Sequence, residues 1–412
     1  MEIKRDSYIE MLKCRMGSGM IKVITGIRRS GKSFLLLELF YKYLLTLGIK
    51  EKHIIKLALD DRANMKYRNP DELYNFLVRK IKGNNTYYVL LDEVQYVAEF
   101  EDILNSLLHI KNTDVFVTGS NAKFLSKDII TEFRGRGDQI HIYPLSFKEF
   151  YSAYQGDKNK ALREYMLYGG LPYILKCSNE QQKTKYLENL FTETYIKDVI
   201  NRNNIKNDGV LSDLLNVIAS SVGSLTNPNK LVNTFKTVKK IGIAANTIKE
   251  YLEYLEDAFI VEKAFRYDVR GKKYIETPLK YYFTDIGLRN ARIGFRQDEA
   301  THIMENVIFN ELKIRGYKVD VGVVTISEPN ENGNYVRKQT EIDFVCNMSD
   351  KRYYIQSALS VSDIDKMNQE CRPLIKTNDF FKKIIVVREP VIPWTNEKGI
   401  FIIGLEDFLL DI

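Results

Sequence analysis

Eight consecutive residues near the amino terminus have the types and spacing needed to hold a polyphosphate. Residues 26–33 read Gly-Ile-Arg-Arg-Ser-Gly-Lys-Ser, which fits the pattern G-x-x-x-x-G-K-[ST] at every fixed position. Glycines let the backbone curl until successive N–H groups point at phosphate oxygens. The lysine supplies a positive charge for the outer phosphates, and the final serine offers its hydroxyl to Mg²⁺. The candidate nucleotide-binding residues are Gly26, Ile27, Arg28, Arg29, Ser30, Gly31, Lys32 and Ser33.

The neighbours of this segment argue against a chance match. Residues 20–25 have the pattern of a strand, and residues 34–40 have that of a buried helix. A helix that starts near Lys32 would direct its positive dipole end at the same phosphates. The strand–loop–helix order therefore predicts that the chain binds a nucleoside triphosphate. We expect Arg28 and Arg29 to face solvent or another subunit, because such loops contact phosphate through their backbone.

Two carboxylates follow an apolar strand further along the chain. Residues 87–91 are apolar or aromatic, and Asp92 and Glu93 come directly after them. Asp92 is placed to hold Mg²⁺ together with Ser33. Glu93 is placed to orient and deprotonate the water that attacks the γ-phosphate. Acidic pairs after strands are also common loop residues, but after a complete phosphate loop this pair predicts hydrolysis.

Two more polar segments could complete a hydrolytic site. Asn121, next to Ser120, could hydrogen-bond the γ-phosphate or the attacking water, although these residue types also suit a simple turn. Arg134 and Arg136 could neutralise transition-state charge as an arginine finger, within the chain or from a neighbouring subunit. A solvated basic loop or a salt-bridged pair stays the alternative for these arginines.

Alternating strand and helix signals over about the first 150 residues predict a parallel α/β sheet. The expected strands are residues 21–25, 54–59, 87–91, 115–118 and 139–143. Ligands bind beyond the carboxyl ends of the strands in such sheets. The phosphate loop, Asp92, Glu93 and Asn121 all follow strand ends. Asp60 also follows one, and we expect it to be an electrostatic neighbour of the site.

The pattern of expected helices and strands changes near residue 208. Three helices, expected at 211–221, 231–241 and 245–257, precede a basic hairpin, and this order suggests a winged helix-turn-helix. Arg266, Arg270, Lys272 and Lys273 of the hairpin suit non-specific contacts with DNA phosphates. The third helix is acidic on its polar side and would be repelled by a groove lined with phosphates, so a protein-contact module stays the alternative.

Length and composition limit the number of domains, the kinds of partner and the expected compartment. The 412 residues correspond to about two to four domains, and the net charge of +7 permits an acidic partner without requiring one. Four widely separated cysteines predict free thiols in a reducing compartment rather than a zinc site. Neither the apolar core of a signal peptide nor an apolar run of membrane-spanning length stands out, so we expect a cytoplasmic protein.

In their order along the chain, these motifs resemble those of AAA+-type ATPases. More narrowly, the chain resembles prokaryotic ATPases with a C-terminal domain of unknown function numbered 4143. Further segments that carry the resemblance are residues 118–121, 133–136, 143–147, 168–172, 305–312 and 340–345. The resemblance implies ATP and Mg²⁺ as ligands. It implies an ATPase core at 1–150, a helical lid at 151–203, a winged helix at 204–292 and a restriction-endonuclease-like α/β domain at 293–412.

A restriction-endonuclease-like tail could have nuclease chemistry, in which acids bind Mg²⁺ and a lysine helps to generate hydroxide. Asp343 could be the first acid, with Glu305 or Glu311 contributing from a helix. The next strand has Gln356 where the second acid belongs and Ala358 where the lysine belongs. An amide is a poor Mg²⁺ ligand and a methyl group cannot activate water, so we expect the tail to be inactive.

Together these features predict a Mg²⁺-dependent ATPase. We expect it to couple its nucleotide state to movement of the winged-helix and C-terminal domains, acting on DNA, on a protein partner or as a homo-oligomer. Two alternatives stay open. One is an ATP-dependent switch without efficient turnover, and the other is an ATP-gated nuclease.

Overall fold

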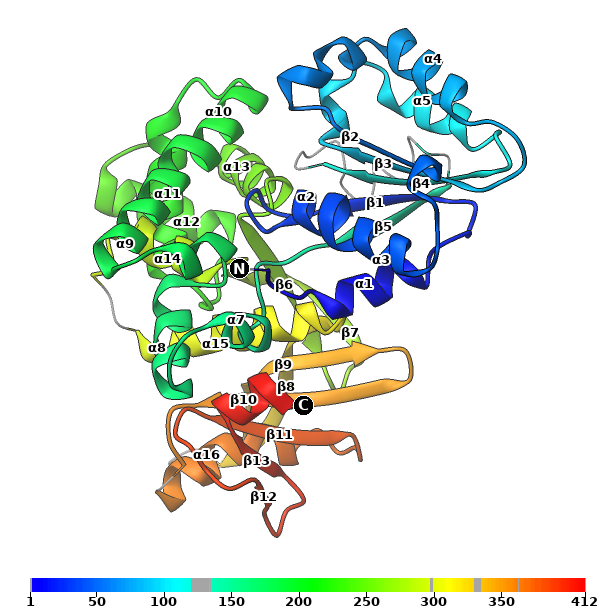
Figure 1. Cartoon of the computed structure of the whole chain (residues 1–412). Helices are drawn as coiled ribbons and strands as arrows, with labels where there is room; N and C mark the ends of the chain where they lie inside the picture. The colour runs from blue at the N-terminus through cyan, green and yellow to red at the C-terminus, as the bar shows by residue number, and fades with distance from the viewer. Residues whose placement is uncertain are drawn as a thin grey trace. The chain divides into compact units, whose positions relative to one another are not determined.

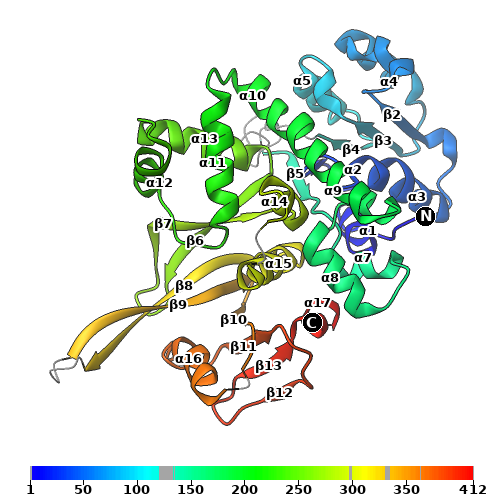
Figure 2. The same ribbon diagram turned by 90° about the vertical axis from the view of Figure 1, so that its left-hand side faces the viewer.

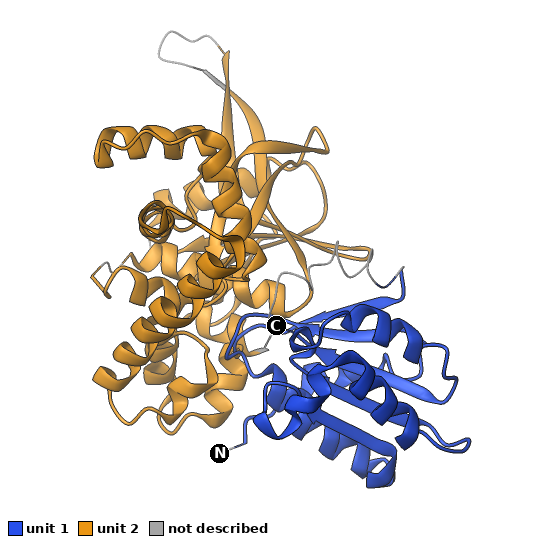
Figure 3. Ribbon diagram, turned by 90° about the horizontal axis from the view of Figure 1, so that it is seen from above, with its two compact units in different colours: residues 1–144 blue, residues 145–412 orange. Residues whose placement is uncertain are grey.

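The computed structural model describes residues 2–119, 133, 135–296, 299–329, 335–361 and 363–411. Two compact units divide the chain, Met1–Pro144 and Leu145–Ile412 (Figure 3). The first unit contains the phosphate loop. The second contains the predicted winged helix and the predicted tail together, and the finer division into lid, winged helix and tail stays a prediction.

Five parallel strands form the sheet of the first unit, in the order β2-β3-β4-β1-β5 (Figure 1). They are β1 Ile21–Thr25, β2 Ile54–Ala58, β3 Tyr87–Asp92, β4 Thr113–Thr118 and β5 Gly137–His141. Each overlaps a strand expected from its apolar run. The prediction of a parallel-sheet α/β unit is therefore confirmed.

Helices cover both faces of this sheet, which explains why β1, β3 and β4 are buried along most of their length. Leu12 and Phe40 belong to the core on one face, and Leu77 and Leu104 belong to the core on the other. The helices of the first face are α1 Asp6–Lys13 and the continuous run of α2 Lys32–Phe34, π-helical Leu35–Phe40 and α3 Tyr41–Thr46, and those of the second face are α4 Pro70–Lys80 and α5 Phe100–Leu107.

The strand order decides which loops become neighbours. β4 lies between β1 and β3, and the three strands run in the same direction. Their carboxyl ends therefore meet at one edge of the sheet. The phosphate loop follows β1 at this edge, Asp92 ends β3 and Thr118 ends β4.

The second unit begins with a helical region (Figure 2). Its helices are α7 Phe147–Ala153, α8 Lys158–Tyr168, α9 Glu180–Asn189, α10 Lys197–Asn203, α11 Asp208–Ser220, α12 Pro228–Thr234 and α13 Ala245–Asp257. The last three confirm the helices expected at 211–221, 231–241 and 245–257. Wider π-helical turns extend α12 to Lys239.

An eight-stranded mixed sheet forms the rest of this unit, in the order β12-β13-β11-β10-β9-β8-β6-β7. The strands are β6 Val261–Asp268, β7 Lys273–Phe283, β8 Lys318–Pro329, β9 Tyr335–Met348, β10 Lys351–Ala358, β11 Lys382–Val387, β12 Trp394–Thr395 and β13 Phe401–Gly404. The helices beside them are α14 Ile286–Arg292, α15 Ala300–Ile314, α16 Ile364–Ile375 and α17 Leu405–Asp411. β8 and β9 form a long antiparallel ribbon (Figure 2).

The expected basic hairpin exists but does not stand free. β6 and β7 pair with each other, and β6 also pairs in parallel with β8 through Arg266, Tyr267 and Asp268. The hairpin is therefore an edge of the larger sheet, which it shares with the predicted tail. No local sequence pattern indicates this pairing, and the separate wing that we expected is not confirmed.

The glycine pair at residues 169–170 is a tightly packed junction. The carboxylate of Asp285, just before α14, accepts a hydrogen bond of 2.7 Å from the Gly170 N–H. A β-carbon on Gly169 would lie 2.1 Å from an oxygen of Asp285, and one on Gly287 would lie 2.0 Å from the Tyr168 carbonyl oxygen. These close approaches fix the end of α8 against α14.

The state of the cysteine thiols and the apolar content of the helices were also predicted from the sequence. All four cysteines are free, as expected, and only Cys14 is exposed. Within the part of the chain that the structure describes, no helix has both the length and the apolar content needed to cross a bilayer.

Candidate functional site

The phosphate loop is held open by two glycines that no other residue could replace without strain. Gly26 has φ +139°, and a β-carbon there would lie 2.1 Å from the Ile142 carbonyl oxygen. Gly31 has φ +98° and immediately precedes α2. Because both conformations disfavour a side chain, the loop backbone keeps the curl that a polyphosphate requires.

Lys32 is buried at the start of α2. Its ammonium donates to the carbonyl oxygens of Gly26 and Ile27, at 2.9 and 3.0 Å, so it spans the loop that it closes. Burial lowers the pKa of Lys32 to about 8, and the carboxylates of Glu93 and Asp92 oppose that shift. A buried ammonium satisfied only by two carbonyl groups is well placed to exchange them for phosphate oxygens.

A buried arginine that the sequence analysis missed braces the loop from behind. The Arg5 guanidinium donates to the Ser30 carbonyl oxygen at 3.1 Å and to the Tyr143 carbonyl oxygen at 2.9 Å. The Ser30 side chain is fully buried, and its hydroxyl has no hydrogen-bond partner among the described residues. No local pattern marks Arg5, since its role depends on segments far along the chain.

Asp92 is buried at the end of β3, where Thr118 and Ser33 reach it. The Thr118 hydroxyl donates to Asp92 Oδ1, and the Ser33 side chain is also hydrogen-bonded to the carboxylate. Burial raises the pKa of Asp92, while these two hydrogen bonds lower it. The expected pairing of Asp92 with Ser33 is thus present in the structure. Asp60 is also close enough for its charge to act on Asp92, as we expected.

Glu93 follows Asp92 with a left-handed backbone, φ +53°. Its N–H donates to the Thr118 hydroxyl at 2.9 Å, and its carboxylate accepts from the Gln95 amide. Thr118 therefore binds both acidic residues, one through its donor and one through its acceptor. The sequence analysis placed Thr118 at the end of a strand and in a segment that carries the resemblance, but assigned it no role.

The donor set of this edge fits a Mg²⁺–triphosphate ligand. The loop offers curled backbone and one ammonium, while the Ser33 hydroxyl and the Asp92 carboxylate are oxygen ligands of the kind that Mg²⁺ prefers. The already formed link between Ser33 and Asp92 shows that both side chains reach one point. Ser33 and Asp92 are the residues that would hold the ion.

Asn121, Arg134 and Arg136 are the remaining residues predicted for the catalytic site. Asn121 and Arg134 lie outside the described residues. Arg136 is described, and its carbonyl oxygen accepts a hydrogen bond of 2.8 Å from the N–H of Ile21. Because Ile21 begins β1 and the phosphate loop follows its other end, Arg136 starts from the opposite edge of the sheet. The role of Arg136 as an arginine finger, within the chain or from a neighbouring subunit, stays a prediction.

A second polar cluster, which is largely buried, joins β7 to the predicted tail. The Lys280 ammonium of β7 forms ion pairs with Glu305 of α15 at 2.8 Å and with Glu341 of β9 at 2.6 Å. Tyr282 donates to Glu305 at 2.6 Å, and the Ser357 N–H donates to Asp343 at 2.8 Å. Burial and the charge of Glu305 raise the pKa of Asp343 well above its usual range.

This cluster gathers the acids considered for nuclease chemistry, except Glu311, which instead pairs with Arg315. Lys280, which sequence reasoning missed because it sought a lysine within β10, is occupied by two carboxylates. The contact between Gln356 and Asp343 is long, because the Asp343 N–H donates to Gln356 Oε1 at 3.4 Å. Among the described residues, no group of three or more acidic, histidine or cysteine side chains is arranged to hold a metal. Inactivity of the tail stays a prediction.

The hairpin cations expected to contact DNA differ in availability. Arg266 donates to Gln339 at 3.3 Å within the sheet, so its guanidinium is committed in part. Arg270 is exposed and donates to the Thr325 carbonyl oxygen at 3.1 Å. Lys272 and Lys273 are exposed and form no ion pair among the described residues. The cations in and next to the β6–β7 turn are therefore more available to a phosphate group than Arg266 of β6.

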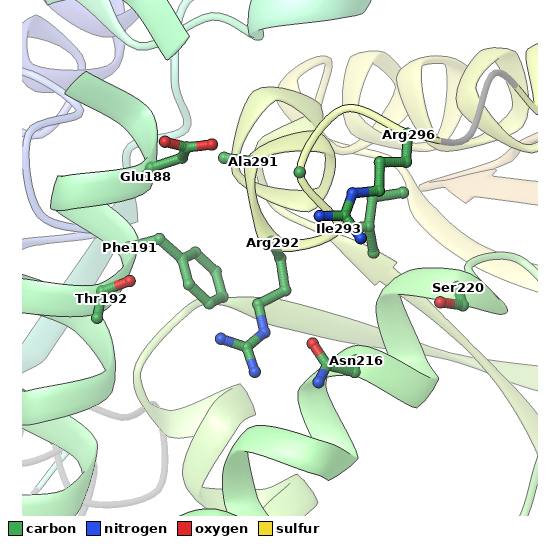
Figure 4. Close-up of a pocket in the computed structure, with 10 residues that line it drawn as sticks. Glu188, Phe191, Thr192, Asn216, Ser220, Ala291, Arg292, Ile293 and Arg296 are labelled. Atoms are coloured by element: carbon green, nitrogen blue, oxygen red, sulfur yellow. The ribbon is translucent and has the colours of Figure 1, made fainter. Parts of the chain in front are cut away.

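A cavity of about 530 Å³ lies among α9, α11 and the end of α14 (Figure 4). Arg292 and Phe191 line it, and the guanidinium lies 5.7 Å from the ring. Arg292 also donates to the Ser212 carbonyl oxygen at 2.7 Å, which ties α14 to α11. We interpret Arg292 as a structural link, and we assign no ligand to this cavity.

Comparison with protein families identifies the first unit. A family model described as an AAA domain matches residues 18–151. A second model, described as a domain of unknown function (DUF8612), matches residues 159–299. The domain of unknown function that we expected was the one numbered 4143, so that part of the resemblance is not confirmed. The AAA match agrees with the loop geometry and supports nucleotide binding.

Solved structures resemble the chain only weakly. The Aeropyrum pernix ORC1 protein in complex with DNA is 11% identical, with a TM-score of 0.31 over 71% of this chain and 92% of that one. The S. cerevisiae Hsp104–ADP complex is 10% identical, with a TM-score of 0.32 over 76% and 43%. Likeness at this level carries no argument about function.

Two sequence relatives match most of the chain. An uncharacterised protein of Methanocaldococcus jannaschii is 28% identical over 381 residues, covering 88% of this chain and 79% of that protein. An uncharacterised protein of Haemophilus influenzae is 34% identical over 414 residues, covering 99% of this chain and 98% of that protein. With an AAA domain at residues 18–151, the chain belongs to the family that includes this Haemophilus influenzae protein.

Proposed function

We propose that the protein is a Mg²⁺-dependent ATPase. The observation that carries the proposal is the junction at Thr118, whose hydroxyl binds both Asp92 and the backbone of Glu93 while Ser33 binds Asp92 from the phosphate loop. A protein that only bound nucleotide would need the loop and a Mg²⁺ ligand. It would not need a second carboxylate held beside them.

Each residue then has a defined task. The loop backbone and Lys32 bind the phosphates, and Ser33 and Asp92 hold the ion, which when bound neutralises phosphate charge. Glu93 orients and deprotonates the attacking water as general base. Arg5 positions the loop, because it holds the Ser30 carbonyl group without facing the ligand itself. We propose Asn121 and Arg134 for the same site, and Arg136 as an arginine finger from a neighbouring subunit.

The second unit is where we propose that nucleotide state is used. We propose that residues 151–203 act as a lid, and that the predicted winged helix and the predicted tail move with the ATP cycle. Exposed cations of the hairpin, Arg270, Lys272 and Lys273, favour a nucleic acid as the partner, since they suit contact with phosphates. A protein partner or a homo-oligomer would use the same unit.

Two other functions were weighed. A switch that binds ATP without efficient turnover is less favoured, because Glu93 is held in place by Thr118 and Gln95. An ATP-gated nuclease is less favoured because Lys280 is engaged by Glu305 and Glu341. Absence of Mg²⁺-dependent cleavage over a panel of DNA and RNA substrates would remove the nuclease.

Nucleotide binding is tested with Lys32→Ala and a matched lysine variant. Equilibrium binding of ATP with Mg²⁺ is compared between wild type, Lys32→Ala and Lys50→Ala, which removes an exposed lysine of the same unit. We expect Lys32→Ala to weaken binding by about a hundredfold, in line with loss of a charge-assisted contact in a buried site, and Lys50→Ala to have no effect. Equal weakening by both, or no binding by wild type, would overturn the proposal.

A further inference from the structure

We propose that a groove between the β6–β7 turn and the β9–β10 turn binds single-stranded nucleic acid. In this groove, exposed lysines would contact phosphates and the ring of Phe381 would stack on a base. The inference deepens the proposed nucleic-acid contact and rests on it. It adds residues of the predicted tail that the hairpin alone does not include.

Three segments of the second unit enclose the groove, which has a volume of about 550 Å³. Val269 to Lys272 come from the β6–β7 turn, Asn347 to Arg352 from the β9–β10 turn, and Thr377 to Phe381 from the segment before β11. The volume lies in the range of sites for small organic ligands, so one nucleotide can enter. The groove exists because β6 joins the sheet of the tail.

Alternating aromatic and cationic groups form one wall of the groove. The Arg352 guanidinium lies 5.4 Å from the ring of Tyr267 and 5.3 Å from the ring of Phe381. Asn347 fixes its orientation by accepting a hydrogen bond of 2.7 Å from Nε. Phe381 remains 41% exposed although it packs in this stack. A rigid, half-exposed ring beside a fixed guanidinium is a surface on which a base can stack.

The charge of the groove favours an anion. Arg270, Lys272 and Lys351 are exposed and form no ion pair among the described residues. Of the two carboxylates in the lining, Asp379 is engaged by the Tyr354 hydroxyl at 2.6 Å and by Lys383 at 3.4 Å. Asp350 is the other, and it is exposed in the β9–β10 turn. Four cations including Arg352 therefore face two carboxylates, one of which is already paired.

The combination of a concave site and an accessible ring favours a single strand over a duplex. Bases in a duplex are stacked on each other, so an aromatic side chain cannot reach their faces without unstacking them. An unpaired strand offers its bases freely, and stacking tolerates any base. The free lysines would follow the backbone on either side.

The test measures binding of fluorescent oligothymidylate and oligouridylate of about ten nucleotides, a length within the range of known single-strand sites, by anisotropy over a series of salt concentrations. Lys272→Ala/Lys351→Ala should bind about tenfold more weakly, with a salt slope reduced by about 1.4 for two lost phosphate contacts. Phe381→Ala should bind about tenfold more weakly with the salt slope unchanged, since it removes stacking rather than charge. Phe381→Trp keeps an aromatic face and should restore binding.

The matched control is Lys160→Ala/Lys185→Ala, which removes two exposed lysines of α8 and α9 and should bind as wild type does. Binding of either oligonucleotide with this pattern supports the groove, and the stronger of the two identifies DNA or RNA. Failure of wild type to bind both oligonucleotides, or unchanged affinity in Phe381→Ala, overturns it. Tighter binding of a duplex that needs the lysines but not Phe381 also overturns it, while leaving the hairpin contact intact. ATP hydrolysis by the same preparations, without oligonucleotide, shows separately whether the ATPase proposal holds.

Discussion

Thr118→Val removes one hydroxyl at the point where the two acidic residues of the site meet. Valine has nearly the same shape, so the change deletes hydrogen bonds without opening a cavity. The lost bonds are the donation to the Asp92 carboxylate and the acceptance from the Glu93 N–H. A bond to a charged group contributes about 1.5–3 kcal/mol and one between neutral groups about 0.5–1.5 kcal/mol, so the variant should lose about 2–4.5 kcal/mol of stability.

The same change should lower hydrolysis more than nucleotide binding. The hydrogen bonds described for the Thr118 hydroxyl go to Asp92 and Glu93 and not to the phosphate loop, so ATP affinity should stay within about threefold. Asp92 and Glu93 lose the hydroxyl group to which both are hydrogen-bonded. If about 1.4–2.8 kcal/mol of the loss falls on the transition state, kcat drops by about 10–100-fold. The assay is steady-state ATP hydrolysis with thermal unfolding of each variant.

A matched control lies on the same strand. The Thr113 hydroxyl, at the start of β4, lies 2.9 Å from the Leu107 carbonyl oxygen and 2.7 Å from that of Ile110. Thr113→Val should therefore lower the unfolding temperature without lowering kcat. If both variants lose hydrolysis equally, the effect is one of stability alone. If Thr118→Val hydrolyses ATP as fast as wild type, Thr118 does not organise the acids and the reasoning is refuted.

Three further predictions concern the loop and the buried cluster. Gly26→Ala should abolish detectable ATP binding, because its β-carbon would lie 2.1 Å from a carbonyl oxygen; titration calorimetry showing wild-type affinity would contradict this. ATP affinity should fall by about tenfold between pH 7.5 and 9.5, because the pKa of Lys32, lowered to about 8, leaves the ammonium charged below that pH and neutral above it; bound phosphate moves the loss to higher pH, and Lys32→Ala should show no such slope. Lys280→Met should cost about 3–5 kcal/mol in urea unfolding, since it leaves Glu305 and Glu341 unpaired in a buried site; the exposed Lys273→Met of the same strand is the control, and equal stability of the two would disprove the account of the cluster.

The first unit could be predicted well because its signals are local. The inner strands β1, β3 and β4 are mostly buried and are followed by polar or glycine residues, and a parallel arrangement places those ends together. Lys32, Ser33, Asp92 and Glu93 are therefore recognisable from spacing alone. Gly26 also follows from the motif, although the reason for it, the nearby Ile142 carbonyl group, becomes visible only in the structure.

The features that were missed depend on contacts between distant segments. Arg5 braces Ser30 and Tyr143, and Thr118 joins residues of two other elements. Periodicity shows which face of a strand is buried but not which strand lies beside it. For that reason β6 was assigned to a free wing, although it pairs with β8.

Glu93→Gln tests the central claim most directly. Glutamine keeps the size of the side chain but cannot accept a proton from water, while Glu72→Gln makes the same change at an exposed position of α4. The measurement is Mg²⁺-dependent ATP hydrolysis beside ATP affinity for both variants. We predict that wild type and Glu72→Gln hydrolyse ATP, and that Glu93→Gln binds it with similar affinity but turns it over at least about a hundredfold more slowly, as loss of a general base implies. Equal turnover by Glu93→Gln, or tight binding by wild type without any turnover, would contradict the account.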